Sequence, residues 1–117
     1  MATTYNFPAH IKGDTMEAVT FTITVNGVAL DLTGASAKMD VRTKDKGNKL
    51  KRYTTTANDG LTIVAPATDG KLRFDKKIVD LVAGVHKHDI EITLFDGSVK
   101  TYISGDFPIT QDVSYGT

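Results

Sequence analysis

The sequence predicts an all-β protein built as an antiparallel β-sandwich, and three observations lead to this fold class. Apolar and polar residues alternate with a period of two along most of the 117 residues. Turn-forming residues separate the alternating segments at spacings of about 8 to 12 residues. A chain of this length can bury one core but not a second lobe, so residues 1–117 are expected to form a single domain.

The amino-terminal half contains the clearest hairpin, in "VTFTITVNGVALDL" (residues 19–32). Its first apolar residues face one way and its threonines face the other, as in a half-buried strand. Asn26 and Gly27 supply the positive φ angles of a type I′ turn, after which the alternation resumes. Two further strands are expected over residues 35–41 and 50–56.

Three Asp-Gly pairs divide the second half into short strands. They lie at residues 59–60, 69–70 and 96–97, each between two alternating segments. Because Asp and Gly both favour tight turns, each pair is predicted to connect two strands. Pro108 is expected on an edge strand, where the backbone donor that it lacks costs nothing.

Residues 76–84 ("KKIVDLVAG") interrupt the alternation. Ile78, Leu81 and Val82 are three and four residues apart, and Gly84 stands where a helical turn would end. We therefore expect one short helical turn near residues 78–83, crossing between the sheets. The seven or eight remaining strands favour an immunoglobulin-like sandwich, with a small β-barrel as the alternative.

The composition excludes several kinds of chemistry. The chain has no cysteine, so disulfides, thiolate nucleophiles and thiolate metal sites are ruled out. Its 14 Lys and Arg balance its 14 Asp and Glu, so no overall field attracts it to nucleic acid or an anionic membrane. No basic leader precedes an apolar run, and no apolar segment reaches the roughly 18 residues needed to cross a bilayer. We expect a soluble protein made in a cytoplasm, without nucleic-acid or membrane partners.

Two histidines open the predicted strand "HKHDIEITL" (residues 86–94). His86 and His88 share the parity of the isoleucines that follow them, whereas Asp89 points to the other face. The three cannot converge on one metal ion, and the remaining histidine, His10, lies near the amino terminus. The alternation favours packing residues whose ring nitrogens meet backbone carbonyls, so no metal or other cofactor is expected.

Residues 42–52 ("RTKDKGNKLKR") form a predicted basic hairpin tip, with six cations against Asp45 alone. Such a tip could bind phosphates. No aromatic platform for base stacking accompanies it, however, because Tyr53 stands by itself. A solvated hairpin, or a docking surface for an acidic partner, is favoured instead.

No catalytic motif is present: the chain lacks a nucleophile elbow, a phosphate-binding glycine loop and a calcium loop. Its aspartates cluster in turns, where turn geometry explains them. We therefore expect no enzyme and no small-molecule substrate. A glycan-binding or adhesion module is the alternative function. Six threonines expected on the surface suit a carbohydrate-facing sheet: Thr20, Thr22, Thr24, Thr54, Thr55 and Thr56. Such a sheet also needs aromatic rings, and the chain has no tryptophan.

Three motifs together resemble a known family. They are "DLTGA" (residues 31–35) before an alternating strand that ends at Arg42, the segment "AG…HDIEI", and the closing pattern "G.F.I..DV". These features resemble small immunoglobulin-like β-sandwich proteins of tailed-bacteriophage virions, and they are similar to the amino-terminal domain of phage baseplate upper proteins. The resemblance spans nearly the whole chain through turn and core residues. Here His88 stands where relatives usually have tyrosine, and Pro108 interrupts the last strand.

The resemblance implies a non-enzymatic structural or assembly component of a virion (tail, baseplate, neck or capsid surface), assembled in the cytoplasm of the host bacterium. Its partners would be other virion proteins and copies of itself, bound through sheet edges and surfaces. The expected contact residues lie in the amino-terminal segment, the basic tip and the carboxyl-terminal tail: Tyr5, Phe7, Ile11, Lys44, Lys46, Lys49, Lys51, Arg52, Phe107, Ile109 and Tyr115.

Overall fold

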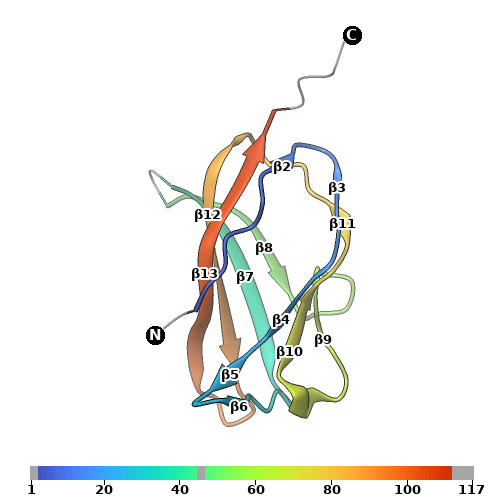
Figure 1. Cartoon of the computed structure of the whole chain (residues 1–117), viewed down its shortest axis with the longest axis vertical. Coiled ribbons are helices and arrows are strands. Elements are labelled where there is room, and N and C mark those ends of the chain that lie inside the picture. The colour runs from blue at the N-terminus through green and yellow to red at the C-terminus, as the bar shows by residue number, and fades with distance from the viewer. Residues whose placement is uncertain (1–2, 45–46, 112–117) are drawn as a thin grey trace.

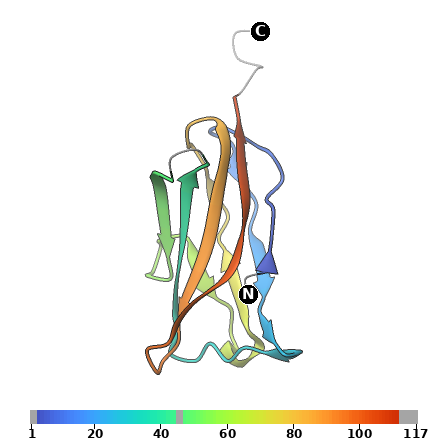
Figure 2. The ribbon, with the colours of Figure 1, turned by 90° about the vertical axis from the view of Figure 1, so that its left-hand side faces the viewer.

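The structure is a computed structural model that describes residues 3–44 and 47–111. These residues form an all-β sandwich, as predicted, in which a large sheet packs against a three-stranded sheet (Figure 1). The large sheet has the strand order β1-β13-β12-β7-β8, with β2 also paired to β13, and the small sheet has the order β4-β10-β9. Most strands run along the long axis of the molecule (Figure 2). The described sheets stay open at their edges, so they do not form the alternative closed barrel.

The alternating segments are divided into short strands, because turns and irregular residues interrupt them. The strands of the described residues are β1 (Thr3–Thr4), β2 (His10–Ile11), β3 (Thr15–Met16), β4 (Val19–Thr22), β5 (Thr24–Val25), β6 (Val28–Ala29), β7 (Ser36–Thr43), β8 (Lys49–Thr54), β9 (Leu61–Ile63), β10 (Lys71–Phe74), β11 (Lys77–Ile78), β12 (Gly84–Thr93) and β13 (Val99–Thr110).

The predicted turns lie where the sequence places them. Asn26 and Gly27 have φ angles of 54° and 80°, and they connect β5 to β6 as a type I′ turn requires. At the end of β12, the Ser98 N–H donates to the side chain of Asp96 at 2.9 Å, and Gly97 has a φ of 90°. The Asp-Gly pairs at residues 59–60 and 69–70 also lie between strands. Local turn chemistry therefore sets these connections.

The core is built mainly from the inward-facing residues of β7, β12 and β13 and from the small sheet. On β12, His86, His88, Ile90 and Ile92 are all buried, so the predicted alternation of this strand is confirmed. Aromatic rings meet at the centre: the ring centroid of Phe7 lies 4.6 Å from that of Phe107 and 5.6 Å from that of Phe74. Phe7, Phe74 and Phe107 are all buried.

Residues 77–83 are not helical, so the prediction of a helical turn near residues 78–83 is wrong. β11 pairs with β3, the Gly13 N–H donates to the Val79 carbonyl at 2.8 Å, and the Val79 N–H donates to the Asp14 carbonyl at 3.1 Å. Val79 is 1% exposed, whereas Ile78 is 68% exposed. Tertiary pairing therefore satisfies the backbone and buries a residue outside the helical pattern. The helical turn of the described chain is a 3₁₀ turn at Ala67–Asp69, between β9 and β10.

Pro108 does not lie on an edge strand, contrary to expectation. β13 pairs with β12 on one side and with β1 and β2 on the other. The carbonyls of Ser104, Asp106 and Thr110 accept hydrogen bonds from the amino-terminal segment, so the nitrogen of Pro108, which has the same parity, faces that segment. It lies opposite the stretch between β1 and β2, where the regular ladder is interrupted. The missing N–H of Pro108 is tolerated there because, as at a sheet edge, no regular ladder hydrogen bond is required of it.

The amino-terminal segment pairs with β13 in the parallel direction and then enters the core. The Tyr5 N–H donates to the Ser104 carbonyl at 2.8 Å, and the Phe7 N–H donates to the Asp106 carbonyl at 3.0 Å. β1 and β2 are also parallel to β13, so this segment departs from the antiparallel pattern of the remaining pairs. Its pairing places the Phe7 ring between the two sheets.

Two residues at one position of the large sheet make room for this segment. Gly105 on β13 pairs with His88 on β12. A Cβ atom at Gly105 would collide with the Tyr5 carbonyl oxygen and would lie 2.7 Å from the Tyr5 carbonyl carbon. The same oxygen lies 2.7 Å from Nε2 of His88, which donates a hydrogen bond to it. The absent side chain and the imidazole together fix the path of the segment.

We predict that Gly105→Ala will destabilise the protein, because the added methyl group must displace the Tyr5 carbonyl from its hydrogen bond with His88. Overpacking of this kind costs about 1 to 3 kcal/mol in the free energy of unfolding. Urea denaturation measures this loss, and amide hydrogen exchange should show faster exchange at Tyr5 and Phe7. Ser104→Ala on the same strand is the control, expected to change stability by less than about 0.5 kcal/mol. Equal stability of the two variants would contradict the steric argument.

Candidate partner-binding surfaces

The predicted contact residues divide into core residues and surface residues. Three of them have buried side chains: Phe7, Phe107 and Ile109. Tyr5 is half-buried, with its ring centroid 5.1 Å from that of Phe21, whereas Ile11 is exposed. Lys46 and Tyr115 lie outside the described residues. The apolar contact candidate that reaches solvent in the described amino-terminal segment is therefore Ile11.

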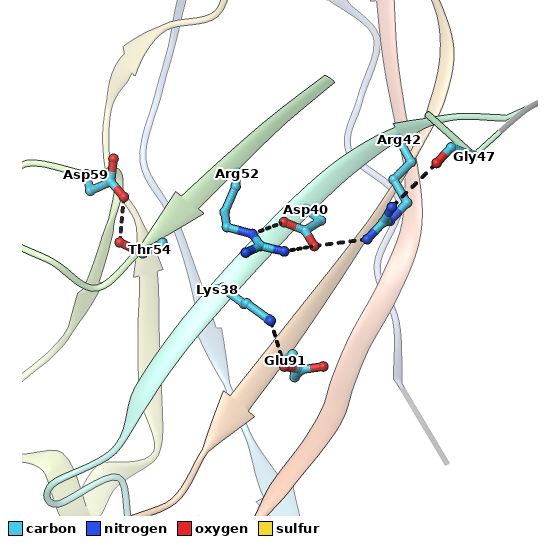
Figure 3. Close-up of polar contacts among 8 residues, drawn as sticks. All are labelled: Lys38, Asp40, Arg42, Gly47, Arg52, Thr54, Asp59 and Glu91. Carbon is cyan, nitrogen blue, oxygen red and sulfur yellow. Dashed lines mark hydrogen bonds and ion pairs between the residues drawn. The ribbon is translucent and has the colours of Figure 1, made fainter. Parts of the chain in front are cut away.

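The basic tip presents both lysines and Arg52 to solvent. Lys44, Lys49 and Lys51 are exposed. Arg52 is engaged with Asp40: its Nε lies 2.7 Å and its Nη2 3.0 Å from the two carboxylate oxygens (Figure 3). Arg42 adds a third contact to Asp40 at 3.2 Å. Within the described residues, Lys44, Lys49 and Lys51 form no ion pair, whereas the two partly exposed arginines share the carboxylate of Asp40.

Asp40 is a buried carboxylate on the outer face of the large sheet, 3% exposed beneath the two arginines. The hydrogen bonds from Arg52 hold the pKa of Asp40 below its ordinary value, against the opposing effect of burial. The same contact raises the pKa of Arg52. The cluster keeps β7 and β8 in register, since Asp40 and Arg52 are cross-strand partners.

Asp89 lies directly across from Asp40, on β12. Burial raises the pKa of Asp89, and the negative charge of Asp40 raises it further. Lys38 and Glu91 form the next cross-strand pair on the same face, with 3.2 Å between Nζ and Oε1 (Figure 3). Among the described residues, Asp89 forms no ion pair. This face therefore contains one well-paired carboxylate and one that the fold disfavours in its charged form.

The two histidines of β12 serve the fold. Nε2 of His86 lies 2.6 Å from the Val82 carbonyl oxygen, and Nε2 of His88 bonds to that of Tyr5. Because a carbonyl oxygen only accepts, each Nε2 carries the proton. Burial lowers the pKa of His88, which keeps its ring neutral, and its Nδ1 has no partner in the described structure. Asp89 points to the opposite face, and the described residues contain no group of three or more potential metal ligands.

Lys77 is a partly buried cation that the sequence did not single out. Its Nζ lies 3.5 Å from the centroid of the Phe74 ring and donates to the Gly60 carbonyl at 3.2 Å. Burial lowers the pKa of Lys77 to about 8. The side chain covers the edge of the aromatic core beside Tyr53, at a centroid distance of 5.3 Å. The alternation of the sequence does not predict these contacts of Lys77, because Tyr53, Gly60 and Phe74 come from separate parts of the chain.

The segments from β2 to β3 and from β11 to the start of β12 lie toward one end of the sandwich, which we call the β2 end (Figure 1). These segments carry four exposed apolar residues. They are Ile11, Ile78, Val82 and Val85. The ion pair of Lys12 with Asp80, at 2.7 Å, joins the segments that carry them. Val82 and Val85 belong to a hollow of about 380 Å³ lined by Thr43, Lys44 and residues 82–86, whereas Ile78 lines a separate hollow beside Lys51 and Tyr53. The base of the basic tip and the amino-terminal segment thus both lie at the β2 end, although they are far apart in sequence.

The opposite end carries a second set of exposed apolar residues: Val25, Val28, Phe95 and Val99. Phe95 is 81% exposed and directly precedes the Asp-Gly turn between β12 and β13. Of these eight residues, sequence reasoning singled out Ile11 as a contact residue and missed the other seven, because alternation assigns a face to a strand residue but does not say which residues at strand ends and in turns stay exposed. A turn signal beside an apolar residue, as at residues 95–97, is the clue that could have found Phe95.

Three of the six predicted threonines are exposed beside a groove of about 610 Å³ between β4 and the large sheet, whereas residues 54–56 line a separate hollow and two of them are half-buried. The groove is lined by Thr20, Thr22 and Thr24 on one side and by the rings of Tyr5 and Tyr102 on the other. The aromatic residues that the sequence did not place near the threonines are therefore brought there by the pairing of β1 with β13.

Comparison with protein families matches residues 10–107 to the BppU N-terminal domain, the amino-terminal domain of phage baseplate upper proteins. The match covers more than half of the sequence. The chain belongs to this family. Membership indicates a structural protein associated with the phage baseplate. Neither the curated proteins nor the solved structures contain a match to this chain.

The matched range of the BppU N-terminal domain begins at β2 and ends within β13. It includes His88, Gly105 and the Asp40 cluster, whereas β1 and Tyr5 precede it. No helix in the part of the chain that the structure describes is long and apolar enough to span a membrane.

We predict that Asp40→Asn will lower the free energy of unfolding near neutral pH by up to about 1 kcal/mol, because both arginines lose their anionic partner at a partly exposed site. The pKa of Asp40 is lower in the folded than in the unfolded chain. Its stabilising contribution is therefore present above about pH 3.9 and is lost as the pH falls through the folded-state pKa. Urea denaturation at a series of pH values should show a shallower acid loss for the variant. An unchanged acid profile would contradict this role.

The Asp89→Asn variant is predicted to have the opposite effect. The pKa of Asp89 is raised by folding, so its ionisation costs stability as the pH rises above the unfolded-state value of about 3.9. Asparagine removes this cost, and the variant should be more stable than the wild type near neutral pH but not in acid. The same denaturation series tests this. In the double variant with Asp40→Asn the gain should shrink, since the opposing charge is gone.

Proposed function

We propose that the chain is a non-enzymatic assembly module of a phage baseplate that binds another virion protein through its β2 end. Family membership supports the baseplate setting. The observation that carries the binding surface is the exposure of Ile11, Ile78, Val82 and Val85 at one end of the sandwich. Ile78 and Val82 are 68% and 57% exposed, although an interior position would stabilise both. Apolar side chains grouped on a surface mark sites of protein contact.

The surroundings of these residues fit a protein partner. A specific interface has an apolar centre and a polar rim. At the β2 end the rim is supplied by Lys44 at the hollow and by the pair of Lys12 with Asp80. Lys44 is exposed and is not among the cations that hold Asp40. A partner that inserts apolar side chains near Val82 and places an acidic group near Lys44 would match this surface.

The proposal requires no reaction, because the module would act by holding neighbours in place within the virion, after assembly in the cytoplasm of the host. The two buried imidazoles support this reading, since both donate to backbone carbonyls. The deepest ionisable groups of the described chain thus have structural roles.

We predict that the double variant Ile78→Asp/Val82→Asp will enter virus particles at least about tenfold less than the wild type, because two carboxylates would be buried at the interface. Particles assembled in cells that supply each variant in place of the normal chain can be purified, and the copy number can be measured by quantitative mass spectrometry. Phe95→Asp/Val28→Asp at the opposite end is the matched control and should enter normally. All four positions are exposed, so thermal unfolding should differ little between the variants.

Two results would overturn the proposal. Normal incorporation of the β2-end variant would show that this end is not the contact. Loss of incorporation only in the control would move the interface to the other end.

A further inference from the structure

β4 forms an unpaired edge of the small sheet. Among the described residues, the strand order β4-β10-β9 leaves one side of β4 without a neighbour. The Ile23 N–H donates to the Gly70 carbonyl at 2.8 Å, so the odd-numbered residues direct their backbone groups toward β10. The backbone N–H and C=O groups of Thr20 and Thr22 therefore point to the open side.

This edge lacks the features that usually block strand addition. Residues 18–25 contain no charged residue and no proline, and β4 pairs with β10 without a register shift. β8, the edge of the large sheet, instead carries Lys49, Lys51 and Arg52 and has a register shift opposite. Natural edge strands use charges, prolines and bulges to prevent pairing with other chains. β8 is protected in this way and β4 is not.

The other two edges are also less open. β9 has three residues, and the loop before it is tied to β8 by a hydrogen bond from Thr54 N–H to the Asp59 carbonyl at 3.1 Å. β1 has two residues in the described chain. Among the edges of the two larger described sheets, β4 thus offers the longest neutral and unblocked strand.

Space for an added strand lies directly beside β4. The groove of about 610 Å³ runs between β4 and the large sheet, where Tyr5, Lys100 and Tyr102 line it. Lys100 is the one charged residue of the described lining. An added strand would therefore meet hydroxyl groups, backbone groups and two tyrosine rings, and it would meet little charge.

We propose that β4 is a strand-addition site and that its occupant is β4 of a second copy of this chain, paired antiparallel about a twofold axis. The edge is self-complementary: Val19 and Phe21 face the core side, and Thr20 and Thr22 face solvent. Antiparallel pairing would oppose threonine with threonine or apolar with apolar residues, and both kinds of pair are favourable. No like charges would oppose each other, whereas two copies of β8 would bring lysines and arginine together.

The twofold pairing joins two small sheets into one continuous sheet across the dimer. Isologous contacts of this kind are the commonest in homo-oligomers, since one surface serves both partners. A charged partner strand would find no opposite charge along residues 18–25 to compensate its desolvation, which favours the neutral second copy. This site is separate from the β2 end, so the failure of either proposal leaves the other intact.

The test is sedimentation velocity on the full-length chain over a range of concentrations up to roughly 1 mM, the weak end of specific association. We expect a reversible dimer for the wild type. Thr22→Pro removes an N–H that points away from β10, so it should weaken dimerisation at least about tenfold while keeping the β10 ladder. Thr22→Val keeps the N–H and is the matched control, expected to dimerise like the wild type.

A second variant covers the case in which Thr22→Pro fails to fold. Thr20→Lys/Thr22→Lys adds four ammonium groups across the twofold axis, on exposed positions, and should leave a folded monomer. A wild type that remains monomeric throughout the concentration range overturns the proposal. A monomer is also the result expected if the groove binds a glycan instead of a second copy. Dimers of unchanged strength in both variants would also overturn it.

Discussion

The hydrogen bond from His88 to the Tyr5 carbonyl, above the bare backbone of Gly105, is the contact on which the rest of this structure depends. This hydrogen bond holds the amino-terminal segment against β13, and the Phe7 ring that follows packs at the centre of the core. The same path leaves β1 beside β13 and gives the groove its Tyr5 wall. One buried imidazole thus links the packing of the core to the shape of a surface.

The two faces of the large sheet differ in the side chains that they carry. Its inner face is apolar apart from the two histidines, whose Nε2 atoms donate to backbone carbonyls. Its outer face is a ladder of charges in which Asp40 is held by two arginines while Asp89 faces it without an ion pair in the described chain. The two arginines stay partly exposed, and the carboxylate of Asp40 neutralises part of their charge.

The surfaces that remain free differ in what they can bind. The β2 end offers apolar side chains around a hollow, which suits insertion into or against another protein. The edge of β4 offers backbone donors and acceptors without charge, which suits another strand. A module with both could join a neighbour of another kind at its end and a copy of itself at its side. Family membership gives such a module its setting, the phage baseplate.

The sequence by itself determined the all-β sandwich, the turns at Asn26-Gly27 and the Asp-Gly pairs, and the inward direction of His86 and His88, because these follow from local φ preferences and from alternation. Only the tertiary structure decided that Val79 is buried by pairing rather than by a helix, that β13 is an interior strand, and that Phe7, Phe107 and Ile109 belong to the core. It also decided which apolar residues stay exposed at the ends. These outcomes depend on which distant segments pair, and the alternation within a segment carries no information about its neighbour.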